Sequence, residues 1–179
     1  ISSGLVGSEM CIRDRRKMYK FRNILEDDLS EIFQINEASI PAVNTVSIGE
    51  FKWFLSKKTY FKCAMDEDRN ICGFLLVLPP GLDYESLNYK WFSSRYSNFA
   101  YIDRIAIDER SKRKGIGSSL YTDLEITMKD KYDLIACEFN IKPLNETSKK
   151  FHEKLDYKNV GYQYTENGTK QVSLMIKKL

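Results

Sequence analysis

The chain has 179 residues, of which 42% are hydrophobic and 30% are charged, and its net charge is +3. This length is enough for one domain with its own core. The small charge excess argues against a nucleic-acid-binding protein, because such proteins usually carry a much larger basic surplus.

The first 17 residues, ISSGLVGSEMCIRDRRK, do not match the rest of the chain. They show no sustained period and lack the apolar core of a signal peptide. We expect residues 1–17 to be a non-native or disordered leader, and residues 18–179 to form a single domain that begins at Met18. No later apolar run is long enough to span a bilayer. A cytoplasmic protein without a membrane partner is therefore predicted.

The four cysteines have no C-x-x-C spacing, so a zinc site is not indicated and no metal is expected. Cys63, Cys72 and Cys137 lie in apolar runs typical of strands. Buried, reduced cysteines are the interpretation that fits this pattern in a reducing cytosol.

Hydrophobic periodicity, caps and turn residues predict twelve elements. They are a strand at 19–25, helices at 26–39 and 48–55, strands at 59–65 and 71–78, a short helix at 88–96, a strand at 101–107, a helix after Gly117, a strand at 133–140, a helix at 145–155, and a closing hairpin of 157–164 and 171–176. This order predicts an α/β fold, with a mixed sheet covered by helices on both faces. The polar-aromatic stretch at 82–98 is either a functional loop or a helix that packs on the sheet, and the two are compatible.

The stretch from Tyr101 to Glu125, YIDRIAIDERSKRKGIGSSLYTDLE, changes from strand to helix periodicity. Asp103, Ile105 and Ile107 alternate with Ile102, Arg104 and Ala106, whereas Ile116, Leu120 and Leu124 are spaced by four. Gly115 and Gly117 stand at the helix start, where free N–H groups and the helix dipole favour an anion. A phosphate or pyrophosphate site is indicated. The alternative is a plain glycine turn with solvent-facing lysines.

A second constellation lies on the helix at 145–155. At 100° per residue, Asn145, Ser148 and His152 form one polar stripe beside the apolar pair Phe151 and Leu155. The stripe contains the only histidine of the chain. Its pKa near neutrality suits proton transfer, and a surface histidine without chemistry is the alternative.

Together the two constellations resemble the GNAT N-acetyltransferase superfamily, in a little-characterised branch. Lys112-Arg113-Lys114-Gly115-Ile116-Gly117 is similar to the cofactor loop [RQ]-x-x-G-x-[GA], with Lys112 in the first place. The stretch from Asn140 to Lys158 resembles the second motif, with His152 where many relatives carry a tyrosine. The resemblance covers Tyr19 to Ile176. It implies a single GNAT-like domain whose twisted sheet is splayed at a cleft for coenzyme A.

The resemblance implies acetyl-CoA as co-substrate and an N-acetyltransferase that acts on a small-molecule or peptide amine. The cofactor would contact the strand backbone, the glycine loop and the second motif: Ile105, Ala106, Ile107, Lys112, Arg113, Lys114, Gly115, Ile116, Gly117, Ser118, Asn140, Asn145 and Ser148. No nucleic acid partner is expected, and monomer and homodimer both stay open.

Direct attack by an amine on a thioester requires a base, because the amine is protonated at neutral pH. Asp103 and Glu138 are the strand carboxylates nearest the implied cleft, and Glu37 is a third candidate. His152 would protonate the departing thiolate. Each carboxylate could instead be an ion-pair partner, for instance Asp103 with a nearby arginine. A catalytically silent acyl-CoA-binding module is the alternative function, and an enzyme for another phosphate ligand is a further one.

Overall fold

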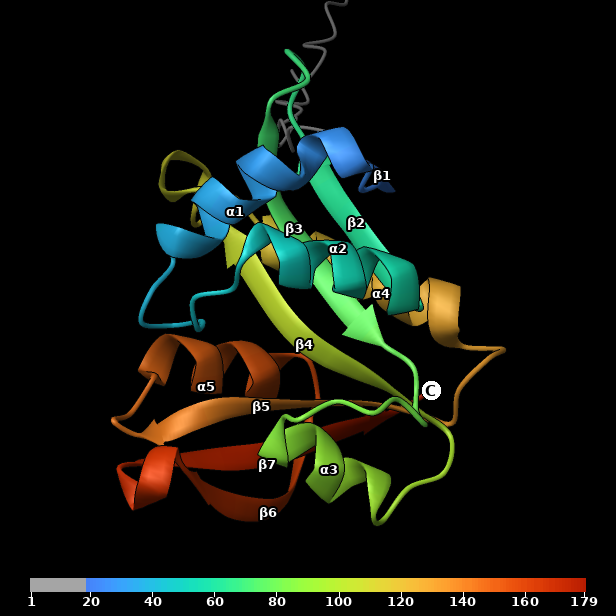
Figure 1. Ribbon diagram of the computed structural model, residues 1–179, viewed down its shortest axis with the longest axis vertical. Helices are drawn as coiled ribbons and strands as arrows, with labels where there is room; N and C mark the ends of the chain where they lie inside the picture. The colour runs from blue at the N-terminus through green and yellow to red at the C-terminus, as the bar shows by residue number, and fades with distance from the viewer. Residues whose placement is uncertain (1–18) are drawn as a thin grey trace, which may run out of the picture.

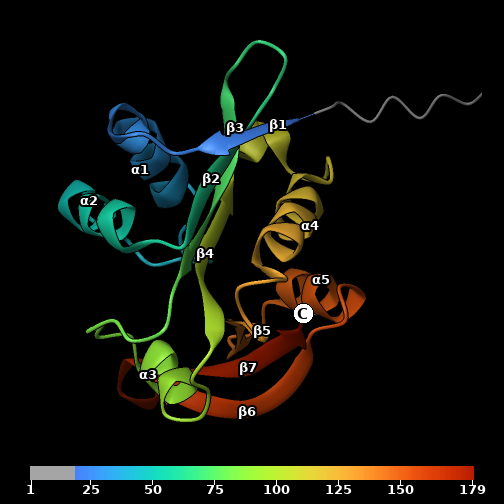
Figure 2. The same ribbon diagram turned by 90° about the vertical axis from the view of Figure 1, so that its right-hand side faces the viewer.

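The computed structural model describes residues 19–179, and the predicted leader at 1–17 lies outside the described residues. Seven strands form one sheet, and five α-helices lie on its two faces (Figures 1 and 2). The strands are β1 Lys20–Asn23, β2 Tyr60–Met65, β3 Ile71–Leu78, β4 Phe99–Ile107, β5 Leu134–Lys142, β6 Lys158–Thr165 and β7 Lys170–Lys178. The helices are α1 Leu29–Glu37, α2 Ile48–Lys57, α3 Leu87–Ser93, α4 Ile116–Met128 and α5 Glu146–Lys154.

The strand order across the sheet is β1-β2-β3-β4-β5-β7-β6. Every neighbouring pair is antiparallel except β4 and β5, which run parallel. A parallel pair needs a crossover connection, and α4 supplies it across one face of the sheet. The predicted mixed α/β sheet and the predicted order of elements are confirmed.

Each face of the sheet has its own apolar core. Helices α1 and α2 pack on one face together with α3, and their core includes Phe51, Phe92 and Leu174. Helices α4 and α5 cover the other face, and the core there includes Leu120, Ile135 and Met175. Figure 2 shows α1 and α2 on one side of the strands and α4 and α5 on the other. A side chain on a central strand therefore belongs to one of two separate environments.

Local signals explain where several helices begin. Ser47 caps α2 by accepting a hydrogen bond from the backbone N–H of Glu50, whose carboxylate accepts one in return from the N–H of Ser47. This reciprocal pair is a capping box. Asn145 caps α5 with its side chain alone, by accepting a hydrogen bond from the N–H of Ser148 at 2.9 Å. The predicted cap at Asn145 is confirmed.

The segment predicted as either a loop or a short helix contains α3. Tyr89 and Phe92 of α3 are 1% and 0% exposed, and they pack against Phe99 and Tyr101 of β4. The aromatic residues that broke the strand pattern thus cover the sheet. Cys63, Cys72 and Cys137 are buried and free, as predicted. Within residues 19–179, no helix is long and apolar enough to cross a membrane.

Candidate active site

The site begins where strands β4 and β5 part. They pair over only three residue pairs, the last of which is Tyr101 with Ala136. Beyond it, β4 continues along β3 and β5 continues along β7, and the two strands diverge (Figure 1). Within residues 19–179, one edge of β4 is therefore left without a partner strand, and such an edge can pair with an extended ligand. The strand residues predicted to contact the cofactor, Ile105, Ala106 and Ile107, all lie on this stretch of β4.

The start of α4 has the features of an anion site. Gly115 is its N-cap residue, with a left-handed φ of 79°, and no side chain from the described part of the chain caps the helix. The N–H of Ser119 is the first to bond back along the helix, to the carbonyl of Gly115 at 3.0 Å. The N–H groups of residues 116–118 are therefore directed at whatever lies beyond the helix end, where the dipole favours negative charge.

Three exposed cations precede this helix start. Lys112 forms an ion pair with Glu109, and the ammonium of Lys114 donates to the carbonyl of Arg110. Arg113 has a φ of 60°, which turns the chain into the glycine loop. The donor set of backbone N–H groups and exposed surface cations fits a pyrophosphate with a neighbouring phosphate.

Helix α5 approaches the same place from the other side. A Cβ built at Gly117 would lie 3.5 Å from the ring of Phe151 and 3.7 Å from Cδ1 of Ile105. The start of α4, the middle of α5 and the free part of β4 therefore meet at Gly117. The backbone N–H of Asn145 donates to the carbonyl of Asn140 at 2.9 Å, so the second predicted motif is held together as well.

His152 lies on the predicted stripe, but the stripe faces the protein interior. Its side chain is buried and stacks on Phe139, with 5.6 Å between ring centroids. Nδ1 donates to the carbonyl of Ser148 at 2.8 Å, and Nε2 is 3.0 Å from the hydroxyl of Tyr121, from which it accepts. Burial lowers the pKa of His152 below its usual value, against the opposing effect of the Ser148 carbonyl. The ring is thus neutral with both nitrogens engaged, and its role as the acid stays a prediction.

Glu138 of β5 lies on the opposite face, among the residues of α3 and β4. Its Oε1 accepts hydrogen bonds from the hydroxyl of Tyr101 at 2.8 Å and from the amide of Asn88 at 2.9 Å. Its Oε2 is buried and has no hydrogen-bond partner among residues 19–179. Burial raises the pKa of Glu138 to about 7, and the charge of Asp103 adds to this, against the two hydrogen bonds. A carboxyl group with a pKa near neutrality can both accept and release a proton.

Asp103 is held in an ion pair rather than presented alone. Its Oδ2 accepts from Nε of Arg104 at 2.7 Å, and its Oδ1 accepts from the hydroxyl of Tyr84 at 2.6 Å. Arg104 also bonds Asn36 of α1 at 3.1 Å, and both members of the pair are buried. This arrangement corresponds to the alternative noted for Asp103, that of an ion-pair partner.

The predicted alternation along residues 101–107 is wrong at Asp103. Leu76 pairs with Arg104 and Val77 pairs with Ile102, so Asp103 is the extra residue of a β-bulge. A bulge places two consecutive side chains on the same side of the sheet. Asp103 and Arg104 therefore both face α1 and α2, whereas Ile105 packs in the core under α4.

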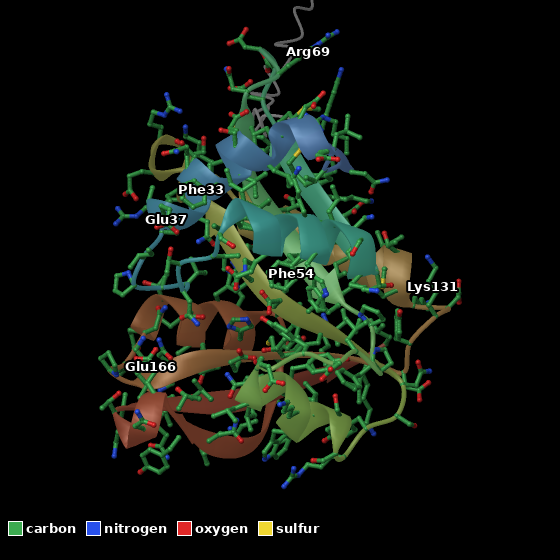
Figure 3. The ribbon with its side chains drawn as sticks, viewed as in Figure 1. Phe33, Glu37, Phe54, Arg69, Lys131 and Glu166 are labelled. Atoms are coloured by element: carbon green, nitrogen blue, oxygen red, sulfur yellow. The ribbon has the colours of Figure 1, made fainter. Side chains whose placement is uncertain are left out.

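The four predicted proton-transfer residues are thus divided between the two faces. Glu138 and Asp103 lie on the α1–α2–α3 face, and His152 lies under α4 and α5. Glu37 stands at the end of α1 (Figure 3), where its Oε1 accepts from the hydroxyl of Thr45 at 2.8 Å. Sequence patterns did not indicate Tyr101 or Asn88. The signals that could have pointed to them are weak. Tyr101 lies two residues before Asp103 on the same strand, and Asn88 lies in the long stretch before β4.

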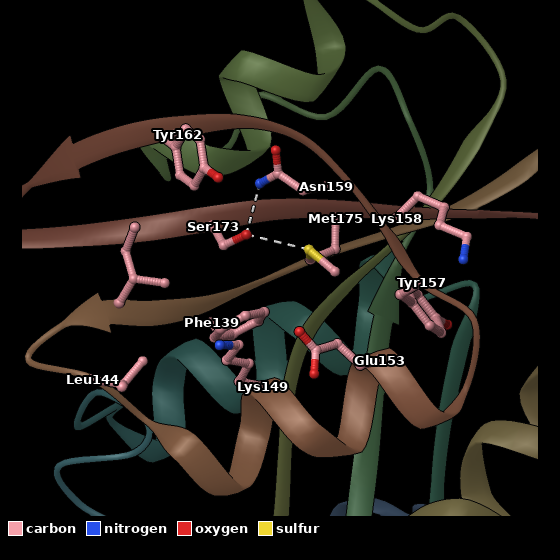
Figure 4. A pocket seen from close by; sticks show the side chains of 11 residues that line it. Phe139, Leu144, Lys149, Glu153, Tyr157, Lys158, Asn159, Tyr162, Ser173 and Met175 are labelled. Carbon is pink, nitrogen blue, oxygen red and sulfur yellow. Dashed lines mark hydrogen bonds between the residues drawn. The ribbon is translucent and has the colours of Figure 1, made fainter.

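A cavity of about 550 Å³ lies between α5 and the hairpin of β6 and β7 (Figure 4). Phe139 and Met175 line it, and inside it the amide of Asn159 donates to Oγ of Ser173 at 2.7 Å. Phe139 and Met175 belong to the core under α4 and α5. The cavity is therefore separated from Glu138 by the sheet.

Comparison with known proteins identifies the family. A family model described as "Acetyltransferase (GNAT) family" matches residues 18–157. The chain belongs to the GNAT acetyltransferase family. It is an enzyme of this family, and the family implies acetyl-CoA as its co-substrate. The resemblance inferred from the sequence is confirmed.

Individual relatives of this GNAT enzyme are distant. It is 23% identical over 155 residues to an N-alpha-acetyltransferase of Saccharolobus solfataricus. The aligned residues make up 85% of this chain and 87% of the relative. Among solved structures it is similar to Ard1 of Thermoplasma volcanium, with a TM-score of 0.71 and 16% identity over 90% of this chain and 97% of the other. It is also similar to NAA60 of Arabidopsis thaliana, with a TM-score of 0.72 and 15% identity over 90% and 98%. These structural likenesses show the fold.

Proposed function

We propose that this GNAT enzyme transfers the acetyl group of acetyl-CoA to a primary amine, and that the acceptor is the α-amine of a peptide. The acceptor class is supported by the similarity to an N-alpha-acetyltransferase across most of the chain. The structure of NAA60 contains a bisubstrate analogue, which agrees with direct transfer between two bound substrates. The observation that carries the proposal is the Glu138 carboxyl group, whose pKa is raised to about 7 and whose Oε2 has no hydrogen-bond partner among residues 19–179.

Glu138 supplies the base in this proposal. Its Oε1 is occupied by Tyr101 and Asn88, so the incoming proton goes to Oε2, the oxygen without a partner. An acceptor ammonium loses one proton to Oε2, and the resulting amine attacks the thioester carbonyl. The C–S bond then breaks, and the proton that the nitrogen loses as the amide forms goes to the departing thiolate, so coenzyme A leaves as the thiol. A pKa of about 7 makes Glu138 largely ionised at pH 8 and still close enough in basicity to share a proton with an amine.

The two substrates would approach the site from opposite faces of the sheet. The glycine loop and α5 lie on one face, and acetyl-CoA would enter the gap between β4 and β5 from there. The acceptor would approach Glu138 from the face of α1 and α2, where the buried Asp103–Arg104 pair lies at the bulge of β4. The two reacting groups would meet at the point where β4 and β5 part.

The test is a thiol-release assay with acetyl-CoA and three matched acceptors: a peptide with a free α-amine, the same peptide with a blocked α-amine and a free lysine, and a set of small amines. We expect turnover with the first, and acetylation of its α-amine by mass spectrometry. Turnover only with the lysine or with small amines would contradict the acceptor class. Binding of acetyl-CoA without turnover on any amine would instead indicate a silent acyl-CoA-binding module.

The matched variant is Glu138→Gln, which keeps the size of the side chain and its Oε1 acceptor. Removal of a general base typically costs 10²–10⁴-fold in rate, and we expect a loss of about that size in kcat/KM. The affinity for acetyl-CoA should be unchanged, because Glu138 lies on the acceptor face. An unchanged rate would assign the base to another group.

A further inference from the structure

Helix α3 reaches the site through one side chain. Asn88 donates from Nδ2 to Oε1 of Glu138 at 2.9 Å, and its Oδ1 accepts from Nε2 of Gln163 on β6 at 2.9 Å. The amide of Asn88 can satisfy both contacts in only one orientation, since a carboxylate accepts and the Gln163 amide nitrogen donates. Gln163 therefore keeps the donor of Asn88 directed at Glu138.

The position of Asn88 is fixed by the way α3 is anchored. The hydroxyl of Tyr89, the next residue, donates to the carbonyl of Pro79 at 2.8 Å and accepts from the N–H of Leu82 at 2.9 Å. Trp91 lies directly over Gly161 of β6, where a built Cβ would be only 2.8 Å from the indole ring. Gly161 is therefore required for the close approach of α3 to β6. With Tyr89 and Trp91 both held in place, Asn88 has little freedom to move.

Few charged groups surround Glu138, so the hydrogen bond from Asn88 should have a measurable effect on its carboxylate. The charged groups that face it are Asp103 and Arg104, which form a pair on β4. The hydroxyl of Tyr101 donates to Oε1, and the hydroxyl of Tyr84 is bound to Asp103. Within residues 19–179, no lysine or arginine, Arg104 included, forms a hydrogen bond or an ion pair with the Glu138 carboxylate. Its ionised form is thus held by two neutral donors, of which Asn88 is one.

We propose that Asn88 is a positioning residue for the base: it fixes the rotamer of Glu138, keeps Oε2 directed at the acceptor, and stabilises the carboxylate form. The inference rests on the proposed function of Glu138. It also gives α3 a role, because the helix that interrupts the chain between β3 and β4 brings a polar group to the reacting atoms from outside the two GNAT motifs.

The test is Asn88→Leu, which preserves the approximate shape and removes the donor. Loss of a hydrogen bond to a charged group should raise the pKa of Glu138 and move the acid limb of kcat/KM by about one pH unit to higher pH. We expect kcat to fall, with KM for acetyl-CoA unchanged. Lys90→Met, an exposed substitution on the same helix, is the matched control and should leave the limb in place.

A second readout separates this inference from the proposed function. The pKa of Glu138 can be followed in the free enzyme by ¹³C NMR of labelled carboxyl groups, with the signal assigned by its absence in Glu138→Gln. A pKa that rises in Asn88→Leu supports the inference even where turnover is absent. A wild-type enzyme that acetylates no amine overturns the function, whereas an unmoved Glu138 pKa in a folded Asn88→Leu overturns the inference.

A variant that preserves Asn88 covers the case in which Asn88→Leu does not fold. Gln163→Met removes the group that orients the amide of Asn88, without altering α3. We expect a shift of the acid limb in the same direction and of smaller size. Cooperative thermal unfolding would show that this variant is folded. An acid limb that does not shift in the folded variant overturns the inference.

Discussion

The buried carboxyl group of Glu138 should make the stability of this enzyme depend on pH. Its folded-state pKa of about 7 lies above the ordinary value of 4.5. A raised folded-state pKa favours the protonated form, so this stabilisation is complete below about pH 4.5 and is lost as pH rises through about 7. Ionisation of Glu138 should therefore destabilise the fold at alkaline pH.

The size of the effect follows from the two pKa values. A difference of about 2.5 pH units corresponds to about 3.4 kcal/mol in total, and about 2.5 kcal/mol of it falls between pH 5 and pH 8. Glu138→Gln cannot ionise, so its unfolding free energy should gain about 2.5 kcal/mol relative to wild type over that interval. In a protein of this length, 1 kcal/mol corresponds to about 2–4 °C in Tm.

The measurement is urea unfolding of both proteins at pH 5, 6, 7 and 8, with the difference between them plotted against pH. The difference removes the contributions of all other titrating groups and any constant effect of the new amide. Glu67→Gln, at an exposed position in the turn between β2 and β3, is the control and should run parallel to wild type. A flat difference for Glu138→Gln would show that this carboxyl does not titrate near neutrality, and the argument for it as the base would fail.

Three further predictions concern the glycine loop, the buried histidine and α3. Gly115→Ala should lower the free energy of unfolding by about 1 kcal/mol, because φ is 79° at this position, and it should weaken acetyl-CoA binding in calorimetry. Gly115→Asn should lose less stability, since asparagine tolerates this conformation. Equal losses in the two variants would contradict the reason given. His152→Asn should lower Tm. It should also remove an acid-induced loss of stability below about pH 6.5, because the lowered pKa of the buried ring makes protonation of the ring unfavourable. If the variant instead lost the alkaline limb of kcat with Tm intact, proton donation by His152 would be favoured. Gly161→Ala should displace Trp91 and slow acetyl transfer, and the added Trp91→Leu should restore the rate if the clash is the cause.

The sequence alone determined the elements and the family. Alternation, helical spacing and caps are local properties, so they located the strands, the helices and the glycine loop of α4 to within a few residues. The prediction of cofactor-binding residues rests on the same kind of local signal, since a strand that ends in a glycine turn and a helix start is contiguous in the chain. The motif from Asn140 to Lys158 is likewise one continuous segment.

Only the tertiary structure decided the environment of each charged side chain. The bulge at Asp103 depends on the register of β3, which no local pattern of β4 records. The burial of His152 depends on Tyr121 and Phe139, which come from two other elements. Glu138 acquires its raised pKa from a site assembled by α3, β4 and β5, and its contact with Asn88 joins residues fifty positions apart. Proton-transfer roles follow from such long-range contacts, because a pKa is set by what surrounds a group in space.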